Sequence, residues 1–506
     1  MLFRIAGASL LGIEAFIVEV EVDINLGLPD YVMVGLPDAS VRESKQRVRA
    51  ALKNCGYTVS SRKIIINLAP ADIRKEGAAF DLPIAMGILA HLDIFPEERL
   101  RDFLFIGELA FDGRLKPGRG VLSAAVLARE KGFRGIVIPK ANEKEASLVR
   151  ELEIFALDNL VQVVHMLQGD EGIRPARIRL EDLLPESRHE IDFREVRGQQ
   201  HVKRALEVAA AGGHNLLMIG PPGAGKTMLA RRLPTILTGM TFDEILEVTR
   251  IHSAAGLLKQ GGAVGTRPFR APHHTVTRAG LIGGGRAPRP GDISLAHNGV
   301  LFLDELPEFP GEVLESLRQP LEDGRVTITR SAMTVTYPCR FMLVAAMNPC
   351  EDALFGASAG EFECTDAQRI RYYSKLSGPL LDRMDIMLEV PKVEFRDIIS
   401  RAEGEGSKEI RSRVEKARAA QSRRFGKSGL YSNSQMRNRE VKRYCAVGRE
   451  GESLLEAAVD RLGFSARAYH RILKVARTIA DLDGEERIGP EHLSEAIQYR
   501  MLDRYF

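Results

Sequence analysis

The stretch that most constrains this chain is residues 220–227, which read GPPGAGKT and have the spacing G-x-x-x-x-G-K-T. An apolar run at 215–219 comes directly before it, and a segment with helical spacing, 228–233, follows. Strand, glycine-rich turn and helix form the context in which this P-loop spacing binds phosphate groups. Gly223 and Gly225 let successive N–H groups point at phosphate oxygens, and the helix adds its positive dipole end. The flanking elements argue against the alternative, a chance glycine-rich turn.

Two polar side chains of this loop have distinct roles. Lys226 supplies a positive charge to the outer phosphates, and Thr227 supplies a hydroxyl ligand for Mg²⁺. The residues that the spacing places around the phosphates are Gly220, Pro221, Pro222, Gly223, Ala224, Gly225, Lys226 and Thr227. The loop therefore predicts that the chain binds ATP together with Mg²⁺.

Two apolar runs downstream end in polar side chains. Residues 299–305 read GVLFLDE, and residues 340–348 read RFMLVAAMN. A continuous apolar run is typical of a buried parallel strand, and ligands bind at the carboxyl ends of such strands. We expect Asp304 to hold Mg²⁺, directly or through water, and Glu305 to orient and deprotonate the attacking water. The alternative, a strand ending in surface acids, is disfavoured by the position downstream of the P-loop.

Composition limits what the whole chain can be. Its 506 residues suggest roughly two to four domains, and 27% charged with 44% hydrophobic residues is an ordinary globular composition. A net charge of +3 is too small to indicate nucleic-acid binding, so any basic surface must be local. Five dispersed cysteines favour a reduced compartment. Glu14 and Glu19 interrupt the apolar N-terminus, and no uncharged run could span a bilayer. We expect a cytoplasmic protein without a membrane partner.

Residues 1–170 alternate strand patterns with short amphipathic helices, which indicates an α/β domain. Residues 107–117 and 138–144 resemble the proteolytic domain of Lon proteases. Lon-type chemistry needs a serine nucleophile and a lysine base. The matching positions hold Ala79, in the run KEGAA, and Leu122, and neither side chain can do this chemistry. We therefore predict a Lon-like fold without proteolysis that serves in assembly or binding.

The rest of the chain divides into three predicted parts. Residues 171–190 combine glycine, proline and charge, which predicts a linker. Residues 191–392 contain the nucleotide motifs and predict a parallel-sheet P-loop core. Residues 393–506 contain a series of helical patterns and predict an α-helical lid domain. The expected fold class is thus a multidomain α/β protein.

Three further positions resemble AAA+ ATPases. Residues 193–200, just before the P-loop, resemble the adenine-side segment, with an ordinary domain-entry helix as the alternative. Asn348 matches the sensor 1 position, where an amide helps to position the attacking water. Arg467 opens a helix of the predicted lid and matches sensor 2, the arginine that reaches the γ-phosphate.

Residues 377–383 read SGPLLDR and match the arginine-finger segment of the same superfamily. The resemblance implies that Arg383 reaches the ATP site of a neighbouring subunit, so a ring is expected and a lone subunit would hydrolyse ATP poorly. The alternative is a structural ion pair between Arg383 and Asp382 or Asp385.

Two insertions lie between these motifs. Residues 267–291 are basic and glycine-rich, and residues 326–337 predict a β-hairpin. Their positions resemble inserts of the AAA+ clade that contains magnesium chelatases and replicative helicases, in which such loops touch phosphates in a central channel. The candidate DNA contacts are Arg278, Arg286, Arg289 and Arg330. Solvated loop arginines are the alternative for each.

The runs 270–275, 291–306, 376–383 and 465–482 closely resemble the ComM/YifB family of magnesium-chelatase-like AAA+ ATPases, over essentially the full length. The resemblance implies a ring-forming, hexameric, ATP-hydrolysing motor that acts on single-stranded or branched DNA. Its implied role is a helicase or branch-migration motor in homologous recombination and natural transformation. The alternative is a magnesium-chelatase-like ATPase subunit that drives remodelling or metal insertion, which the Lon-like domain disfavours.

Two features invite a metal interpretation. His273 and His274, taken as part of a strand, would point to opposite faces, which disfavours a shared metal site. Many relatives carry two cysteine pairs after the sensor strand, whereas this chain keeps only Cys350 and Cys364. Two thiolates and an aspartate could bind zinc with a fourth ligand, and a metal-free loop is the alternative.

Overall fold

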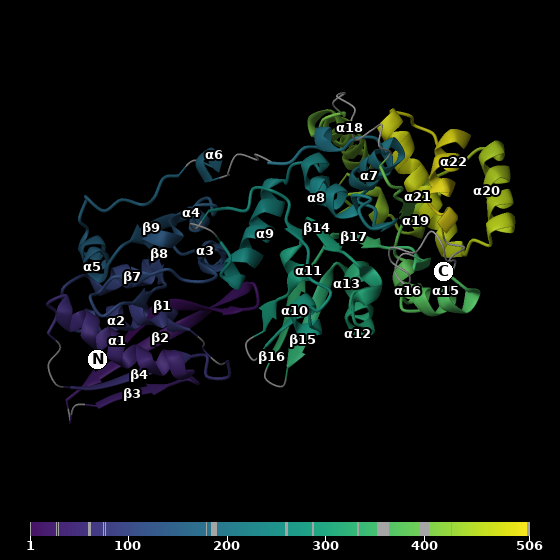
Figure 1. The fold of residues 1–506 in the computed structure, drawn as a ribbon. Helices are drawn as coiled ribbons and strands as arrows, with labels where there is room; N and C mark the ends of the chain where they lie inside the picture. The colour runs from purple at the N-terminus through teal and green to yellow at the C-terminus, as the bar shows by residue number, and fades with distance from the viewer. Residues whose placement is uncertain are drawn as a thin grey trace. The chain divides into compact units, whose positions relative to one another are not determined.

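The computed structural model describes residues 2–26, 28, 30–58, 62–73, 75, 77–178, 180–183, 190–258, 262–285, 288–330, 333–351, 364–393, 404–426 and 428–502. Contacts divide the chain into two compact units. The N-terminal unit contains Met1–Glu186 and Thr241–Gly265, and the C-terminal unit contains Ser187–Met240 and Thr266–Phe506. Figure 1 shows the elements of both, coloured from purple at the N-terminus to yellow at the C-terminus. The predicted domain boundaries stay predictions.

The first sheet of the N-terminal unit has the strand order β1-β2-β4-β3. β2 (Glu14–Asn25) alternates apolar and polar residues, and it buries Val18, Val20 and Val22 completely. β1 (Leu2–Leu11) pairs antiparallel with β2 along its whole length. β1 was not predicted from the sequence, because its mixed apolar pattern becomes a strand only through this pairing. The remaining strands are β4 (Lys63–Ala69) and β3 (Asp30–Val34).

A second, parallel sheet of this unit has the order β5-β8-β9, beside a hairpin of β6 and β7. The strands are β5 (Phe103–Phe105), β6 (Glu108–Leu109), β7 (Leu115–Lys116), β8 (Gly135–Pro139) and β9 (Glu153–Leu157). The helices are α1 (Ala39–Asn54), α2 (Asp81–Ala90), α3 (Val121–Glu130), α4 (Glu143–Ala146), α5 (Leu160–Gln168) and α6 (Leu180–Leu183). Ala79 lies in a short 3-10 turn, and Leu122 is fully buried in α3. The mixed α/β organisation expected from the sequence is confirmed.

One helix of the N-terminal unit comes from a distant part of the sequence. α9 (Phe242–Ala255) begins at a capping box between Thr241 and Glu244 and ends at Gly256, which has φ of 72°. It follows the helix of the P-loop in the chain, inside the predicted 191–392 core, yet its contacts place it in the N-terminal unit.

The C-terminal unit is built on a five-stranded parallel sheet with the order β11-β14-β17-β10-β18. The strands are β10 (Leu216–Ile219), β11 (Phe269–Arg270), β14 (Val300–Leu303), β17 (Met342–Met347) and β18 (Ile386–Glu389). β10, β14 and β17 are buried along their whole length, as their continuous apolar runs predict. Because β17 lies between β10 and β14, the polar residues that end these three strands meet at one edge of the sheet.

Helices and two hairpins surround this sheet. The helices are α7 (Gln200–Gly212), α8 (Lys226–Ile236), α10 (Arg278–Ile282), α11 (Asp292–Leu295), α12 (Gly311–Glu315), α13 (Arg318–Asp323), α15 (Asp366–Tyr373) and α16 (Gly378–Leu381). The hairpins pair β12 (Gly283–Gly284) with β13 (Arg289–Pro290), and β15 (Arg325–Arg330) with β16 (Met333–Pro338). The second hairpin confirms the one predicted for residues 326–337.

The C-terminal residues form the helices that the sequence predicts. They are α18 (Ser407–Phe425), α19 (Asn438–Tyr444), α20 (Arg449–Leu462), α21 (Ala466–Asp483) and α22 (Pro490–Gln498). α21 buries Ile472, Val475 and Ile479 in the same apolar core that contains strands β10 and β17. The predicted lid and the sheet therefore share one core within the C-terminal unit.

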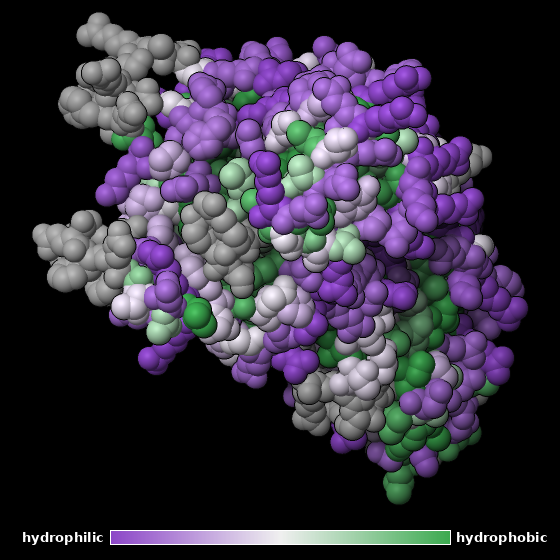
Figure 2. Space-filling model, turned by 90° about the vertical axis from the view of Figure 1, so that its right-hand side faces the viewer, coloured by the Kyte–Doolittle hydropathy of each residue, from purple (hydrophilic) through white to green (hydrophobic). Residues whose placement is uncertain are grey.

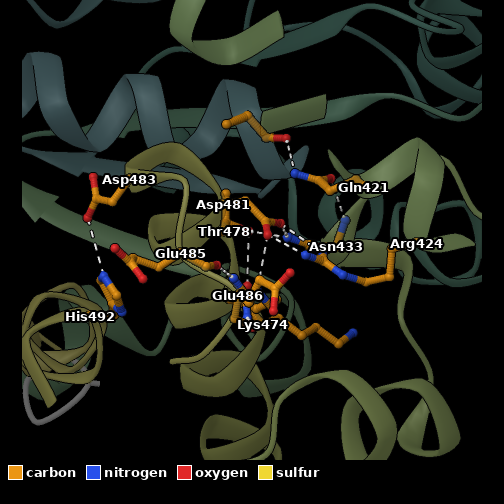
Figure 3. Close-up of polar contacts among 12 residues, drawn as sticks. Gln421, Arg424, Asn433, Lys474, Thr478, Asp481, Asp483, Glu485, Glu486 and His492 are labelled. Atoms are coloured by element: carbon orange, nitrogen blue, oxygen red, sulfur yellow. Dashed lines mark hydrogen bonds and ion pairs between the residues drawn. The ribbon is translucent and has the colours of Figure 1, made fainter. Parts of the chain in front are cut away.

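A buried polar network also joins the C-terminal helices to α7 (Figure 3). Asp481 of α21 accepts hydrogen bonds of 2.8 Å from Arg424 Nη1 and Asn433 Nδ2. Gln421 of α18 donates from Nε2 to the Ala211 carbonyl of α7 at 3.0 Å. A buried charge is costly unless it is paired and hydrogen-bonded. This network therefore favours one arrangement of α18 and α21 against α7.

His214 and Asp385 extend the network toward the sheet. His214 Nδ1 lies 3.2 Å from Asp385 Oδ2, and His214 Nε2 lies 2.8 Å from Thr478 Oγ1 on α21. Burial opposes the charged form of Asp385, but the hydrogen bond and charge of His214, with Arg471 and Lys474, outweigh it and lower its pKa to about 2.

This low pKa predicts an acid-dependent loss of stability. A carboxyl group whose folded pKa is below its unfolded value of about 3.9 stabilises the native state at higher pH. The contribution of Asp385 should be fully present above about pH 5 and should disappear as the pH falls toward 2. Asp385→Asn should therefore be less stable at pH 6, yet its stability should fall less steeply between pH 4 and about 2. Urea unfolding followed by circular dichroism checks this, and identical slopes would contradict it.

Among the described residues, no helix combines the length and the apolar character needed to cross a bilayer. On the face drawn in Figure 2, hydrophilic residues cover most of the surface and apolar residues form smaller patches between them.

Candidate functional site

The P-loop, β14 and β17 bring four of the predicted side chains together. Thr227 Oγ1 donates to Asp304 Oδ2 at 2.6 Å. Lys226 Nζ donates to Asn348 Oδ1 at 3.0 Å and to the Gly220 carbonyl at 2.5 Å. The sequence predicted each of these side chains separately, and the strand order β14-β17-β10 explains why they converge.

Backbone conformation shapes the loop around this group. Gly223 and Gly225 have φ of 79° and 89°, a left-handed conformation that favours glycine. A Cβ atom added to Gly220 would lie 2.2 Å from the Val390 carbonyl oxygen, so only glycine fits between the P-loop and the end of β18. Lys226, at the start of α8, is 8% exposed, so its ammonium group is held inside the loop.

The residues present fit a nucleotide with Mg²⁺. A hydroxyl and one carboxylate, Thr227 and Asp304, lie in contact, and Mg²⁺ is usually held by one or two such oxygens with waters and phosphate oxygens. Gln199 was missed as a site residue: its Nε2 donates to the carbonyls of Ala224 at 3.0 Å and Pro391 at 2.9 Å. Its buried Oε1 has no hydrogen-bond partner in the described structure. An unpaired buried acceptor beside the P-loop favours a ligand with an N–H donor, such as an adenine amino group.

Glu305, the predicted general base, occupies an unusual backbone position. Its φ of 54° is left-handed, which is uncommon for a residue other than glycine and is found preferentially at functional sites. Its side chain is 56% exposed at the end of β14, so water can reach the carboxylate. His274 Nδ1 lies 3.4 Å from Glu305 Oε2.

The two adjacent histidines differ from the prediction. Residues 273–275 follow β11 as a turn rather than a strand, so the rings of His273 and His274 lie on the same side, with centroids 4.0 Å apart. The expectation that they point to opposite faces is therefore wrong. The ring of Phe309 approaches His274 edge-on at 6.4 Å, which helps to fix the imidazole beside Glu305. No group of three or more possible metal ligands occurs in the described part of the chain.

We predict that His274 restrains Glu305 before hydrolysis. His274→Ala should release the carboxylate and change kcat for ATP by about threefold to tenfold, with KM changing less, because the contact is with the base and not with the P-loop. His274→Gln keeps a polar side chain and should stay closer to the unchanged protein. Steady-state ATPase assays check this, with His273→Ala as the matched control. Equal kcat in all proteins would contradict the prediction.

Arg383 follows α16, two residues after its last residue. It forms an ion pair with Glu322 of α13 and not with Asp382 or Asp385, the partners considered from the sequence. Its Nε atom is buried, and no described residue offers it a hydrogen-bond partner. Burial lowers the pKa of Arg383, and several nearby arginines lower it further.

Arg467, the predicted sensor 2 residue, opens α21 beside Arg383. Its side chain is 72% exposed, and Nη1 donates to Asp382 Oδ2 at 2.9 Å. The described contacts of Arg467 do not include the P-loop, so its role toward the γ-phosphate stays a prediction.

The structure describes only part of the predicted DNA-binding set. Arg278, at the start of α10, and Arg289, in β13, are exposed. Arg330 ends β15, and its side chain is not among those described, whereas Arg286 lies outside the described residues. Both described arginines belong to the insertion that begins beside His274.

The two remaining cysteines of the sensor loop are joined. Cys350 and Cys364 form a disulfide with Cα atoms 6.5 Å apart. These two cysteines are dispersed in the sequence, and the fold brings them together between the end of β17 and α15. Asp352, the third zinc ligand considered, lies outside the described residues.

Comparisons with known proteins identify the family of the chain. Three family models match successive parts of the chain: "Subunit ChlI of Mg-chelatase" at residues 20–142, "Magnesium chelatase, subunit ChlI" at 192–398 and "Magnesium chelatase, subunit ChlI C-terminal" at 404–500. Competence protein ComM of Haemophilus influenzae is 45% identical over 502 residues, which cover 98% of this chain and 96% of that protein. The chain belongs to the ComM/YifB family of magnesium-chelatase-like AAA+ ATPases.

Two other relatives match the chain at different levels of identity and coverage. The uncharacterized protein YifB of Escherichia coli is 42% identical over 496 residues, covering 98% of this chain and 96% of YifB. The magnesium-chelatase 38 kDa subunit of Rhodobacter capsulatus is 23% identical over 324 residues, covering 60% of this chain and 84% of that subunit. The resemblance to the ComM/YifB family, stated from the sequence motifs, is therefore confirmed. Membership in this family supports an ATPase that uses Mg²⁺.

Proposed function

We propose that this protein is a ring-forming, hexameric ATPase that acts on single-stranded or branched DNA as a helicase or branch-migration motor in homologous recombination and natural transformation. The observation that carries the ATPase part is the convergence of Lys226, Thr227, Asp304 and Asn348 at one sheet edge. The DNA part is supported by the exposed Arg278 and Arg289, and by the full-length similarity to a competence protein.

Each residue of the site has a defined role in this proposal. Lys226 and the loop N–H groups bind the phosphates, and Thr227 with Asp304 would hold Mg²⁺, which supplies charge neutralisation of the phosphates. Glu305 accepts a proton from the attacking water, and Asn348 positions that water. Arg467 of the same chain and Arg383 of a neighbouring chain would stabilise charge on the transferred phosphoryl group.

ATPase activity with and without DNA tests this proposal. We expect slow hydrolysis alone and faster hydrolysis with single-stranded or branched DNA, falling as salt rises because phosphate contacts release counterions. Glu305→Gln, which should bind ATP without turning it over, is the control for a contaminating ATPase. Hydrolysis that no DNA changes would overturn the DNA part and leave the ATPase part intact.

A second candidate is an ATPase subunit that drives metal insertion, because all three family models describe magnesium chelatase. Coverage favours the first candidate: the chelatase subunit of Rhodobacter capsulatus matches 60% of the chain, whereas ComM matches 98%. Metal insertion into a porphyrin, assayed with the other chelatase subunits, distinguishes them.

A further inference from the structure

Helix α9 packs in the N-terminal unit, although the elements before and after it in the chain belong to the C-terminal unit. It lies in the chain between α8, which begins at Lys226, and β11, both in the C-terminal unit. All the contacts described below for residues 241–265 are made inside the N-terminal unit. A helix anchored in this way connects the P-loop, through the chain, to the N-terminal unit, which contributes no residue to the described nucleotide site.

The helix is anchored near both of its ends. At its start, the Arg150 guanidinium lies over the Phe242 ring, 5.1 Å from the centroid. Near its end, Arg250 Nη2 donates to Glu14 Oε2 at 3.0 Å and to the Ile13 carbonyl at 3.3 Å. The Arg250 side chain is only 17% exposed, so the ion pair with Glu14 is partly shielded from solvent.

The deepest anchor is a buried carboxylate. Glu145 of α4 is 2% exposed, and burial raises its pKa. Its carboxylate accepts hydrogen bonds from Asn142 Nδ2 at 2.5 Å, from the Leu122 N–H at the start of α3, and from Ser253 Oγ of α9. α9 therefore supplies one of the donors that make this burial tolerable. The Gly120 N–H also donates to the Ser253 carbonyl at 3.3 Å.

The segments that lead from α8 to α9 and back to β11 are held in the C-terminal unit. Only residues 237–240 separate α8 from the N-cap of α9. Where the chain returns, Arg267 donates to the carbonyl of Thr238 at 2.7 Å, of Gly239 at 3.3 Å and of Asn298 at 2.7 Å. One guanidinium thus ties the outgoing and returning segments together beside the strand that leads to Asp304 and Glu305.

We propose that α9 transmits the nucleotide state of the P-loop to the N-terminal unit, with Arg250 and Ser253 as the positioning residues. The proposal rests on the proposed ATPase function. It adds a role for the N-terminal unit, which responds through α9 to the binding and hydrolysis of ATP. A change at Lys226 or Thr227 is passed along the 11 residues of α8 and across four residues to α9. The contacts of α9 with Glu14, Glu145 and Gly120 then carry it to α3 and β2.

Hydrogen exchange of the full-length protein tests this inference, with and without a non-hydrolysable ATP analogue. In the unchanged protein, we expect the analogue to protect P-loop peptides and to change exchange in peptides covering 118–130 and 241–256. In Arg250→Glu, exchange in 241–256 should rise by about fivefold or more, and the analogue should no longer affect 118–130. Glu14→Arg combined with Arg250→Glu restores opposite charges and should recover the response. Arg129→Glu, on the exposed end of α3, is the matched control for charge reversal.

The outcomes separate the inference from the proposed function. If the analogue protects the P-loop but leaves 118–130 unchanged in the unchanged protein, the transmission is overturned and ATP binding stands. If the analogue does not protect the P-loop, the proposed function fails, and this inference fails with it. If Arg250→Glu does not fold, Ser253→Ala is used: a full response at 118–130 in that variant would overturn the role of Ser253.

Discussion

Lys226→Ala should abolish nucleotide binding. Lys226 is 8% exposed and donates to Gly220, Pro221 and Asn348, so its ammonium group is fixed beside the loop that would hold the phosphates. A hydrogen bond between charged groups contributes about 1.5–3 kcal/mol, and several to one phosphate group correspond to a loss of affinity of about 100-fold or more. Titration of a fluorescent ATP analogue measures this directly.

The control for this variant is Lys131→Ala, which removes an exposed lysine of the N-terminal unit. It should bind the analogue as the unchanged protein does. Lys226→Arg keeps the charge but not the compact ammonium group, and the tight enclosure of Lys226 predicts that it also binds poorly. Affinity within about threefold of the unchanged protein in Lys226→Ala would show that the loop does not bind the triphosphate in the expected way.

Arg383→Ala should leave ATP binding intact and reduce hydrolysis by about 10³-fold or more in the assembled protein. In the isolated chain, this side chain is paired with Glu322. Its Nε atom is buried without a hydrogen-bond partner among the described residues, and burial, followed by the charges of Arg318, Arg471 and Arg467, lowers its pKa. In the proposed ring, a phosphate of the neighbouring subunit would take the place of Glu322 as the anionic partner of Arg383.

Mixed assemblies distinguish a shared site from a structural role. Arg383→Ala and Lys226→Ala are each expected to be inactive alone. In a mixture, some interfaces combine an intact P-loop from one subunit with an intact Arg383 from the next, so part of the activity should return. No recovery, in mixtures shown by native mass spectrometry to contain both variants, would contradict action between subunits. Glu322→Gln, which removes the ion-pair partner of Arg383, tests whether that pair holds the arginine in place before assembly.

The local chemistry of the nucleotide site was determined by the sequence itself. Glycine spacing, the charge of Lys226 and apolar runs that end in polar residues are patterns within short stretches, and such patterns are enough to predict a P-loop and the strands beside it. The hairpin at 326–337, the helical C-terminus and family membership were predicted on the same basis. The orientation of His273 and His274 was predicted wrongly, because their segment was interpreted as a strand. It is a turn, and a turn orients adjacent side chains differently from a strand.

Contacts between distant residues were decided only by the tertiary structure. Gln199, His274 and Arg250 have no local pattern that assigns them a partner, yet they contact the P-loop, Glu305 and Glu14. The same holds for β1, whose strand depends on β2, and for α9, which was not predicted and which packs in the N-terminal unit. A helix or a loop is set by a few adjacent dihedral angles, whereas its packing depends on which other surfaces the whole chain brings to it.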